Sequence, residues 1–326
     1  MSSKVILKTH QLAIGYPKFT VAADIDVALY EGELVCLIGP NGAGKSTLLR
    51  TIAGIQTPIT GHTTLLGDDV HKLEARELAR RLSIVLTDRI DVGLLSGYAL
   101  VALGRHPYTD WTGQLSKQDE AIIRWAVEAV GAEEIAPRNV NELSDGERQK
   151  LMIARALAQE PAVMLLDEPT AYLDLPRRVE IMLLLRDLAR KTSRAILLST
   201  HDLDLALRNA DRIWLMPKDG VLQVGAPEDL VLSGAFESAF SSEGVLFDRR
   251  AGSFRTQVEA TKTIVVEGEG VRKIWTIRAL ERIGYALDDK ALCRVIVTES
   301  TWILHHGDSS SNYDALHRLV MALSEI

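Results

Sequence analysis

A glycine-rich stretch from Gly39 to Thr47 has the residue types and the spacing needed to bind a polyphosphate. It follows the apolar run Leu34–Ile38 and precedes an apolar-periodic segment, which predicts a buried strand, a loop and a helix in that order. Glycines let the backbone approach phosphates, and Lys45 adds a mobile positive charge. An ordinary glycine-rich turn is the alternative. We expect phosphate contacts from Gly39, Asn41, Gly42, Gly44, Lys45, Ser46 and Thr47.

Two carboxylates and a histidine follow two further apolar runs. Asp167 and Glu168 come directly after residues 163–166, and His201 comes directly after residues 195–200. Asp167 is suited to order Mg²⁺, together with Ser46, and Glu168 is suited to orient and polarise an attacking water. The structural alternative is an acidic turn and a packing histidine. Because open α/β sheets bind ligands at the carboxyl ends of their strands, the convergence of the three favours phosphate chemistry.

A second helix N-terminus has the features of a phosphate site. Ser144 is followed three residues later by Glu147, which is the pattern of a capping box, just before the helical run Leu151–Ala158. In the structural interpretation, this pattern only marks the start of a helix. In the functional interpretation, the positively polarised helix end, an exposed hydroxyl and the flexible Gly146 can bind a phosphate.

The remaining pattern predicts the elements that hold these groups. Residues 5–29 alternate with a period of two, which predicts an antiparallel sheet with one wet face. Tyr16 lies in a turn of this region, where it can stack on an adenine or simply pack. Residues 91–141 have apolar positions at helical spacing and predict a helical insertion.

After about Val258 the pattern restarts as strand, helix, strand, strand and helix. We therefore expect a small α+β domain, with strands at residues 263–266, 293–298 and 301–304 and helices at residues 271–283 and 313–323. The pair His305-His306 is interpreted as a strand end, since no further metal-ligand set is evident nearby.

Length and charge limit the classes of function. A chain of 326 residues can form one large domain and one small one, and a net charge of −7 makes nucleic acid an unlikely partner. No apolar run is long enough to span a bilayer, and the N-terminus leads into a strand-like segment, so we expect a cytoplasmic protein. Cys36 and Cys293 lie in apolar runs and are interpreted as buried free thiols.

Five ordered motifs resemble those of the ATP-binding subunit of an ABC transporter, over about residues 4–257. The motifs are Walker A at Gly39–Thr47, the signature at Leu143–Glu147, Walker B at Leu165–Glu168, the D-loop at Ala171–Asp174 and the switch histidine His201. Within that family, Ala102–Tyr108 and the overall layout resemble importers of iron-siderophore complexes, haem and cobalamin.

The resemblance implies an α/β fold in two domains. The first, residues 1–257, would be a P-loop ABC-type ATPase domain with a mixed sheet core, an antiparallel β subdomain and a helical subdomain at about residues 90–160. The second, residues 258–326, is the small accessory domain, to which the resemblance gives no role.

The resemblance also implies a mechanism that uses ATP and Mg²⁺. Two copies would form a head-to-tail homodimer, in which the P-loop of one subunit and the signature residues Ser144, Gly146 and Glu147 of the other close on one ATP. Glu168 would be the catalytic carboxylate and His201 would contact the γ-phosphate. The resemblance further implies that Asp174 acts across the interface and that Tyr16 stacks on the adenine.

Two departures from the family pattern affect the site. The glutamine usual in the loop after Ile84-Val85-Leu86 is missing, and Asp88 stands there; a carboxylate can bind Mg²⁺ through water but cannot donate a hydrogen bond when ionised. The signature has Asp145 and Glu147 in place of glycine and glutamine, but it retains Ser144 and Gly146.

The leading hypothesis is an ATPase on the inner face of the cell membrane. It would power import of an iron chelate, haem or cobalamin through separate integral membrane permease subunits and, through them, a substrate-binding protein. The alternative is a soluble ABC ATPase of DNA repair or translation that is not coupled to a permease. A P-loop kinase or GTPase is a third hypothesis, but it leaves the signature and His201 unexplained.

Overall fold

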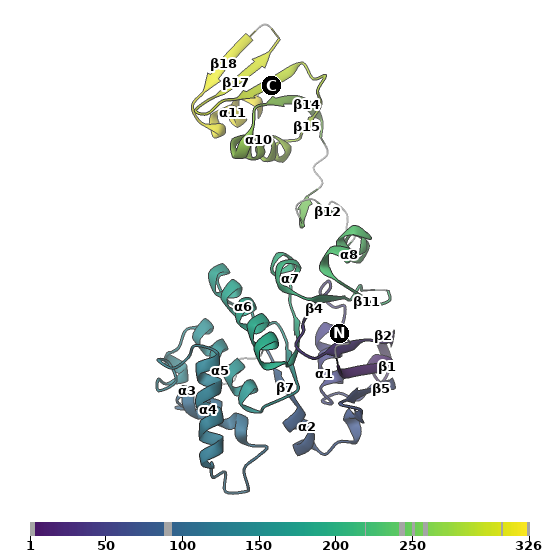
Figure 1. The fold of residues 1–326 in the computed structure, drawn as a ribbon. Helices are drawn as coiled ribbons and strands as arrows, with labels where there is room; N and C mark the ends of the chain where they lie inside the picture. The colour runs from purple at the N-terminus through teal and green to yellow at the C-terminus, as the bar shows by residue number, and fades with distance from the viewer. Residues whose placement is uncertain are drawn as a thin grey trace. The chain divides into compact units, whose positions relative to one another are not determined.

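The computed structural model describes residues 4–87, 93–218, 220–240, 245–249, 252–256, 260–307 and 309–324. The chain divides into two compact units (Figure 1). The first unit contains residues 1–241 and 247–253, and the second contains residues 242–246 and 254–326.

A six-stranded mixed sheet forms the core of the first unit, in the order β11-β10-β4-β9-β8-β7. Strands β10, β4, β9, β8 and β7 are parallel, and β11 is antiparallel to β10. The bounds are β4 Leu34–Ile38, β7 Leu82–Val85, β8 Val163–Leu166, β9 Ala195–Ser199, β10 Arg212–Leu215 and β11 Gln223–Gly225. Strands β4, β8 and β9 are apolar runs because helices or a second sheet cover both faces. Their carboxyl ends lie at one edge, where the predicted phosphate-binding residues follow.

An antiparallel sheet and helix α1 pack on one face of the core sheet. The strands are β1 Val5–Tyr16, β2 Phe19–Ile25, β3 Ala28–Tyr30, β5 Thr60–Leu65 and β6 Asp68–Asp69. Helix α1, Lys45–Ile52, buries Leu48 and Leu49 in the same apolar cluster as Leu7 of β1 and Val35 of β4. The cluster holds the start of α1 against the end of β4.

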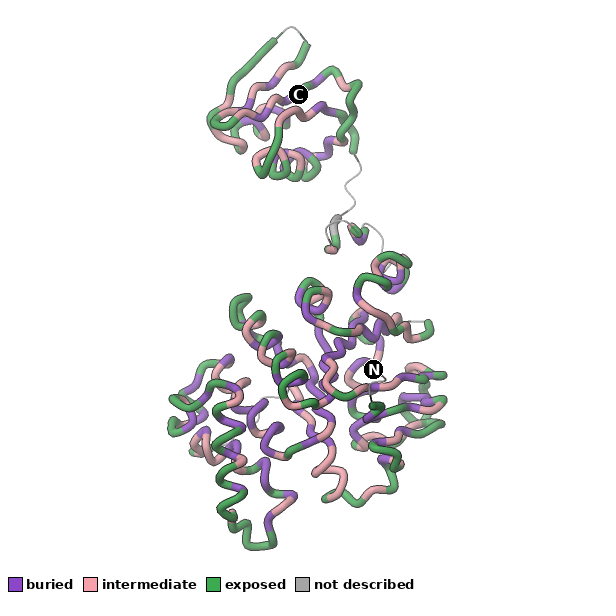
Figure 2. The backbone as a smooth tube through the Cα atoms, in the orientation of Figure 1, coloured by how far each residue is buried: buried purple, intermediate pink, exposed green. Residues whose placement is uncertain are grey.

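Helices cover the other face of the core sheet, where their buried residues share a cluster with the strands. Figure 2 shows that buried and exposed positions alternate along the helices. Besides α1, the helices of the first unit are α2 Ala75–Arg81, α3 Gly97–Ala102, α4 Lys117–Ala129, α5 Asp145–Ala158, α6 Leu175–Thr192, α7 Leu203–Asn209, α8 Pro227–Leu232 and α9 Ala235–Ala239, with short 3₁₀ helices at Val70–Lys72, Leu103–Arg105 and Val140–Glu142. Buried residues of α3, α4, α5 and α6 share one cluster with β8 and β9. This arrangement confirms the predicted α/β fold with an antiparallel β part and a helical part.

A buried arginine ties the helical part together. Arg105 is only 3% exposed, and its guanidinium donates to Asp119 at 2.8 Å and to Glu160 at 2.8 Å. It also donates to the carbonyl of Ala158 at 2.8 Å, and its Cζ atom lies 3.8 Å from the ring centroid of Tyr108. The side chain therefore joins α4 to the C-terminal end of α5.

The second unit is a small α+β domain whose sheet has the order β15-β14-β16-β17-β18. Its elements are β14 Lys262–Glu267, α10 Gly270–Arg282, β15 Tyr285–Leu287, β16 Cys293–Val297, β17 Trp302–His306, β18 Ser309–Tyr313 and α11 Leu316–Ser324; a separate pair, β12 Val245–Asp248 and β13 Ser253–Thr256, precedes them. The predicted order of strand, helix, strand, strand and helix omits β15 and β18, and α11 begins at Leu316, whereas the prediction starts it at Tyr313. The reason is that β15 is short and β18 is a polar, largely exposed edge strand without alternation.

The cysteines have the environment that the sequence predicts. Cys36 and Cys293 are free and buried, and burial raises the pKa of both thiols, with the charge of Asp211 adding to the effect at Cys36. Within the described part of the chain, no helix combines the length and the hydropathy that a bilayer span requires.

Candidate nucleotide-binding and hydrolysis site

The glycine-rich loop joins β4 to α1 through close backbone contacts. Gly44 caps α1 with φ +103°, and a Cβ atom there would lie 2.3 Å from Cγ1 of Val21. A Cβ atom on Gly39 would lie 2.1 Å from the carbonyl oxygen of Met216. The first turn of α1 contains no acidic residue, so its N–H groups and the positive end of its dipole are available to an anion.

Lys45 folds back onto the loop that precedes it. Its Nζ atom donates to the carbonyl of Gly39 at 2.9 Å and to that of Pro40 at 3.2 Å, and the residue is 6% exposed. Burial lowers the pKa of this ammonium group, while the charges of Glu168 and Asp167 act in the opposite direction. An ammonium group has three donors, so Lys45 can bind a phosphate oxygen while it keeps its loop contacts.

Ser46 and Asp167 face each other between α1 and the end of β8. The Oγ atom of Ser46 donates to Oδ1 of Asp167 at 3.2 Å, and Asp167 is 6% exposed. A hydroxyl and a carboxylate are hard oxygen ligands of the kind that Mg²⁺ prefers, so this donor set fits the ion. The hydroxyl of Thr87, at the end of β7, donates to the carbonyl of Asp167 at 2.7 Å.

Glu168 and His201 form a close pair although they follow different strands, β8 and β9. Their Oε1 and Nε2 atoms are 2.6 Å apart, and the side chains are 32% and 45% exposed, respectively. Glu168 has φ +49°, in the left-handed region that non-glycine residues rarely occupy. Its backbone N–H donates at 2.9 Å to the hydroxyl of Ser199, a buried residue that the sequence analysis did not single out.

The predicted capping box is present at the start of α5. Oε2 of Glu147 accepts from the N–H of Ser144 at 2.8 Å and from its hydroxyl at 2.7 Å. These hydrogen bonds, together with Arg138, hold the pKa of Glu147 below its ordinary value. Gly146 is covered by Arg177 of α6, whose Cδ atom lies 3.5 Å from the place of a Cβ.

Two other predicted residues lie at the ends of secondary-structure elements. Tyr16, the last residue of β1, is 54% exposed and pairs in register with Phe19, which is 66% exposed. Asp174 caps α6, and its Oδ1 atom accepts from the N–H of Arg177 at 3.0 Å. Asp88 lies outside the described residues.

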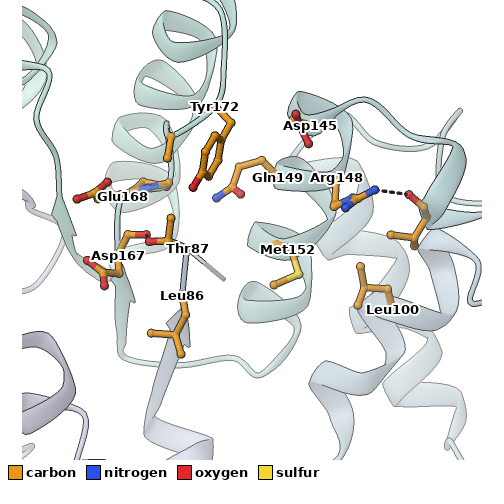
Figure 3. Close-up of a pocket in the computed structure, with 13 residues that line it drawn as sticks. Leu86, Thr87, Leu100, Asp145, Arg148, Gln149, Met152, Asp167, Glu168 and Tyr172 are labelled. Carbon is orange, nitrogen blue, oxygen red and sulfur yellow. Dashed lines mark hydrogen bonds between the residues drawn. The ribbon is translucent and has the colours of Figure 1, made fainter. Parts of the chain in front are cut away.

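A cavity of about 60 Å³ lies between the end of β7, the turn after β8 and helix α5. Figure 3 shows the residues that line it. Thr87, Glu168 and Gln149 line it, and Tyr172, which has φ +64°, lies beside Gln149. The Nε2 atom of Gln149 is buried without a hydrogen-bond partner in the described structure. The sequence analysis includes Tyr172 only as part of the D-loop Ala171–Asp174 and gives no role to Gln149, because the residue type alone indicates no chemistry at either position.

The structure thus brings part of the predicted set together in one chain. Lys45, Ser46, Asp167, Glu168 and His201 all follow the neighbouring strands β4, β9 and β8, and hydrogen bonds connect several of them. The hydroxyl of Ser144 instead bonds to Glu147 on its own helix. The intrachain hydrogen bonds therefore do not connect Ser144 to the residues that follow β4, β8 and β9.

Comparison with known proteins gives two family matches. Residues 22–171 match the model described as ABC transporter, and residues 261–324 match the model described as iron ABC transporter C-terminal domain.

Similar relatives span most of the chain. An uncharacterized ABC transporter ATP-binding protein of Methanocaldococcus jannaschii is 42% identical over 268 residues, which is 81% of this chain and 92% of the relative. The ferric enterobactin transport ATP-binding protein FepC of Escherichia coli K12 is 36% identical, over 74% of this chain and 89% of the relative. The cobalamin import ATP-binding protein BtuD of Halobacterium salinarum is 36% identical, over 80% of this chain and 67% of the relative.

Solved structures agree with the fold. The ATP-binding cassette MJ0796, in a dimeric post-hydrolysis state bound to ADP and phosphate, superposes with a TM-score of 0.59 at 26% identity, over 68% of this chain and 99% of that chain. A second dimeric structure of that cassette gives the same TM-score of 0.59 at 25% identity, over the same shares of the two chains, 68% and 99%. Together with the relatives, these matches establish what the motifs predicted: the chain belongs to the ATP-binding proteins of the ABC transporter family and is an ABC-type ATPase.

Proposed function

We propose that the chain powers import of an iron chelate such as a ferric siderophore, of haem or of cobalamin through a separate membrane permease. The observation that carries the substrate class is the match of residues 261–324 to the iron ABC transporter C-terminal domain. The names of the relatives support the same class, since they are transport proteins for ferric enterobactin, achromobactin, petrobactin and cobalamin.

In the proposed site, Lys45 and the other loop residues hold the phosphates of ATP. The residues that would hold Mg²⁺ are Ser46 and Asp167, with Asp88 as a further candidate. When bound, the ion would neutralise negative charge on the phosphate oxygens. The close approach of Ser46 to Asp167, at 3.2 Å, supports this assignment.

Glu168 is proposed to orient and deprotonate the attacking water, and His201 to contact the γ-phosphate. Their separation of 2.6 Å supports a shared task, because each side chain limits the rotamers of the other. The imidazole therefore restrains the direction of the Glu168 carboxylate.

We further propose that two copies of the chain assemble head to tail. Ser144, Gly146 and Glu147 would complete the site of the partner subunit, and Asp174 would act across the interface. Ser144 is exposed and bonds within its own helix, so its hydroxyl is available to another molecule once it turns away from Glu147. The dimeric structures of the similar cassette MJ0796 support this arrangement.

The adenine is proposed to stack on Tyr16, a residue that is 54% exposed at the end of β1. We also propose that residues 1–257 are the ATPase domain, with its helical subdomain at about residues 90–160, and that residues 258–326 are an accessory domain. The separate family matches at residues 22–171 and 261–324 support this division. The chain would act on the cytoplasmic face of the membrane with permease subunits and, through them, a substrate-binding protein, and without nucleic acid.

The test is reconstitution of the chain with its permease in proteoliposomes. Uptake of a ferric siderophore, haem and cobalamin is measured separately with ATP supplied on the side of the ATPase. The proposal expects ATP-dependent uptake of one of these ligands, which is lost in the Glu168→Gln variant. Hydrolysis of ATP without association with any permease would contradict the transport role and favour the soluble class.

A further inference from the structure

Ser199 is a fully buried polar residue at the carboxyl end of β9. Its exposed fraction is 0%, and it ends the otherwise apolar run Ala195–Leu198. It lies between β4 and β8, opposite Leu37 in the β4–β9 register. A hydroxyl that is buried inside the sheet forms its hydrogen bonds with protein groups. The identity of these groups indicates the function of the residue.

Both hydrogen-bonding capacities of Ser199 are used at the end of β8. Its Oγ atom donates to Oδ1 of Asp167 at 2.6 Å and accepts from the backbone N–H of Glu168 at 2.9 Å. Asp167 and Glu168 are the two carboxylates of the proposed site. One hydroxyl therefore contacts the side chain of the first and the main chain of the second.

The bond to Glu168 anchors a strained backbone. Glu168 has φ +49°, a conformation that persists in a non-glycine residue only when surrounding contacts impose it. The carboxylate of Glu168 is partly exposed and contacts His201, so its direction depends on how the main chain is held. The hydroxyl of Ser199, on the neighbouring strand β9, restrains this main chain by accepting the hydrogen bond from the N–H of Glu168.

The bond to Asp167 restricts the other carboxylate. Oδ1 accepts from Ser199 as well as from Ser46, which fixes the plane of the carboxyl group. If Ser46 turns its oxygen toward a metal ion, Ser199 still holds Oδ1, and Oδ2 keeps its orientation.

We propose that Ser199 is a positioning residue for hydrolysis: it aims the carboxylate of Glu168 through the backbone and fixes the carboxylate of Asp167. The inference rests on the proposed roles of these two residues. Because Ser199 is two residues before His201, it also connects the strand that carries the histidine to both carboxylates.

The test compares Ser199→Ala with Ser83→Ala in the full chain. Ser83 is a matched control, since it lies on β7, on the other side of β8 in the same sheet, is 2% exposed and has no hydrogen-bond partner for its Oγ in the described structure. Ser199→Ala should lower kcat about 10–100-fold, which is typical when a group that supports a ligand is removed. The KM for ATP should stay within about twofold, because Ser199 has no place among the phosphate-binding residues.

A second readout does not depend on turnover. Mn²⁺ affinity in the presence of ADP, measured by electron paramagnetic resonance, should fall about tenfold in Ser199→Ala and remain unchanged in Ser83→Ala. If Ser199→Ala does not fold, Ser199→Cys keeps a side chain of similar size and weakens the donor, and it should show a lower kcat and a lower Mn²⁺ affinity than Ser83→Ala.

The two proposals fail in different ways. If kcat and Mn²⁺ affinity of Ser199→Ala both match those of Ser83→Ala, the role of Ser199 is wrong while the proposed site stands. If the wild-type chain hydrolyses no ATP, the proposed function is wrong, and the Mn²⁺ affinities alone decide on Ser199.

Discussion

The Nε2 atom of His201 lies 2.6 Å from Oε1 of Glu168, although the two residues are separated by 33 positions in the chain. The adjacency of β8 and β9 produces this contact, since both residues follow the carboxyl ends of neighbouring parallel strands. Nε2 carries at most one hydrogen, so it can donate to Glu168 or to a phosphate oxygen, but not fully to both. Binding of ATP is therefore expected to change this hydrogen bond.

Replacing Glu168 by glutamine should separate binding from hydrolysis. The amide keeps the size of the side chain but cannot accept a proton, so we expect kcat to fall about 10²–10⁴-fold. Nucleotide affinity should stay within about twofold, and ATP should trap a dimer that light scattering detects. Glu31→Gln, an exposed carboxylate in a turn, is the control and should behave as wild type. Normal turnover in Glu168→Gln would show that another group is the base.

Removing the imidazole of His201 should reduce hydrolysis without unfolding the chain. If the ring donates to the γ-phosphate, His201→Ala should lower kcat about 10²–10³-fold, as does the loss of one preorganised donor. The side chain is 45% exposed, so the melting temperature should change little. His71→Ala, at an exposed position, is the matched control. Equal kcat values for the two variants would exclude His201 from the site.

Adding a methyl group to Gly44 should distort the phosphate-binding loop. Its φ of +103° disfavours alanine, and the new Cβ would lie 2.3 Å from Cγ1 of Val21. Gly67 has a similar φ of +94° but no atom within 4 Å of the Cβ position, so Gly67→Ala isolates the backbone strain. We expect Gly44→Ala to lose nucleotide binding in a fluorescence titration and Gly67→Ala to retain it. Similar affinities in both variants would mean that the loop tolerates the contact.

Removing the guanidinium of Arg105 should destabilise the helical part of the first unit. Arg105→Ala leaves the buried Asp119 without its ion pair, which typically lowers the free energy of unfolding by about 3–5 kcal/mol. Arg208 pairs with Asp204 on the surface, so Arg208→Ala should cost less than about 1 kcal/mol. Denaturant titration measures both values. A loss below 1 kcal/mol for Arg105→Ala would mean that the network is not needed for stability.

The capping box should make stability depend on pH. Hydrogen bonds from Ser144 lower the pKa of Glu147 in the folded chain, so its contribution is present above the ordinary pKa of a glutamate. The contribution is lost as the pH falls through the lower folded pKa. The difference in melting temperature between wild type and Glu147→Gln should therefore be largest near neutral pH and vanish in acid. A difference that is constant with pH would contradict the assignment.

The sequence predicts the roles of residues that stand in a recognisable local pattern. It does not predict the roles of residues that depend on which strands lie side by side in the fold. Asp167 and Glu168 follow an apolar run and precede a proline, so the pattern indicates them directly. Ser199 ends a similar run, but one serine in a strand has no spacing that distinguishes it. Its role emerges only when β8 and β9 lie side by side.

The second unit shows the same limit for secondary structure. The apolar residues of α10 recur at helical spacing, so the sequence predicts this helix. The sequence does not predict β18, because Ser309–Tyr313 has no alternation of apolar and polar residues. Pairing with β17 determines that this segment is a strand. An edge strand with polar residues on both faces depends on its neighbour more than on its own propensity.

Strand β8 assigns alternate residues to different cores: Val163 and Leu165 to the cluster with α1, and Met164 and Leu166 to the cluster with α5. Loss of a single codon within this strand would turn the residues that follow the deletion to the opposite face, and it would also put Glu168 in the place of Asp167 and Asp167 in the place of Leu166. One genetic event would thus damage both cores and the site together. We expect descendants of this gene to vary in length in the loops, while β8 changes only by substitution.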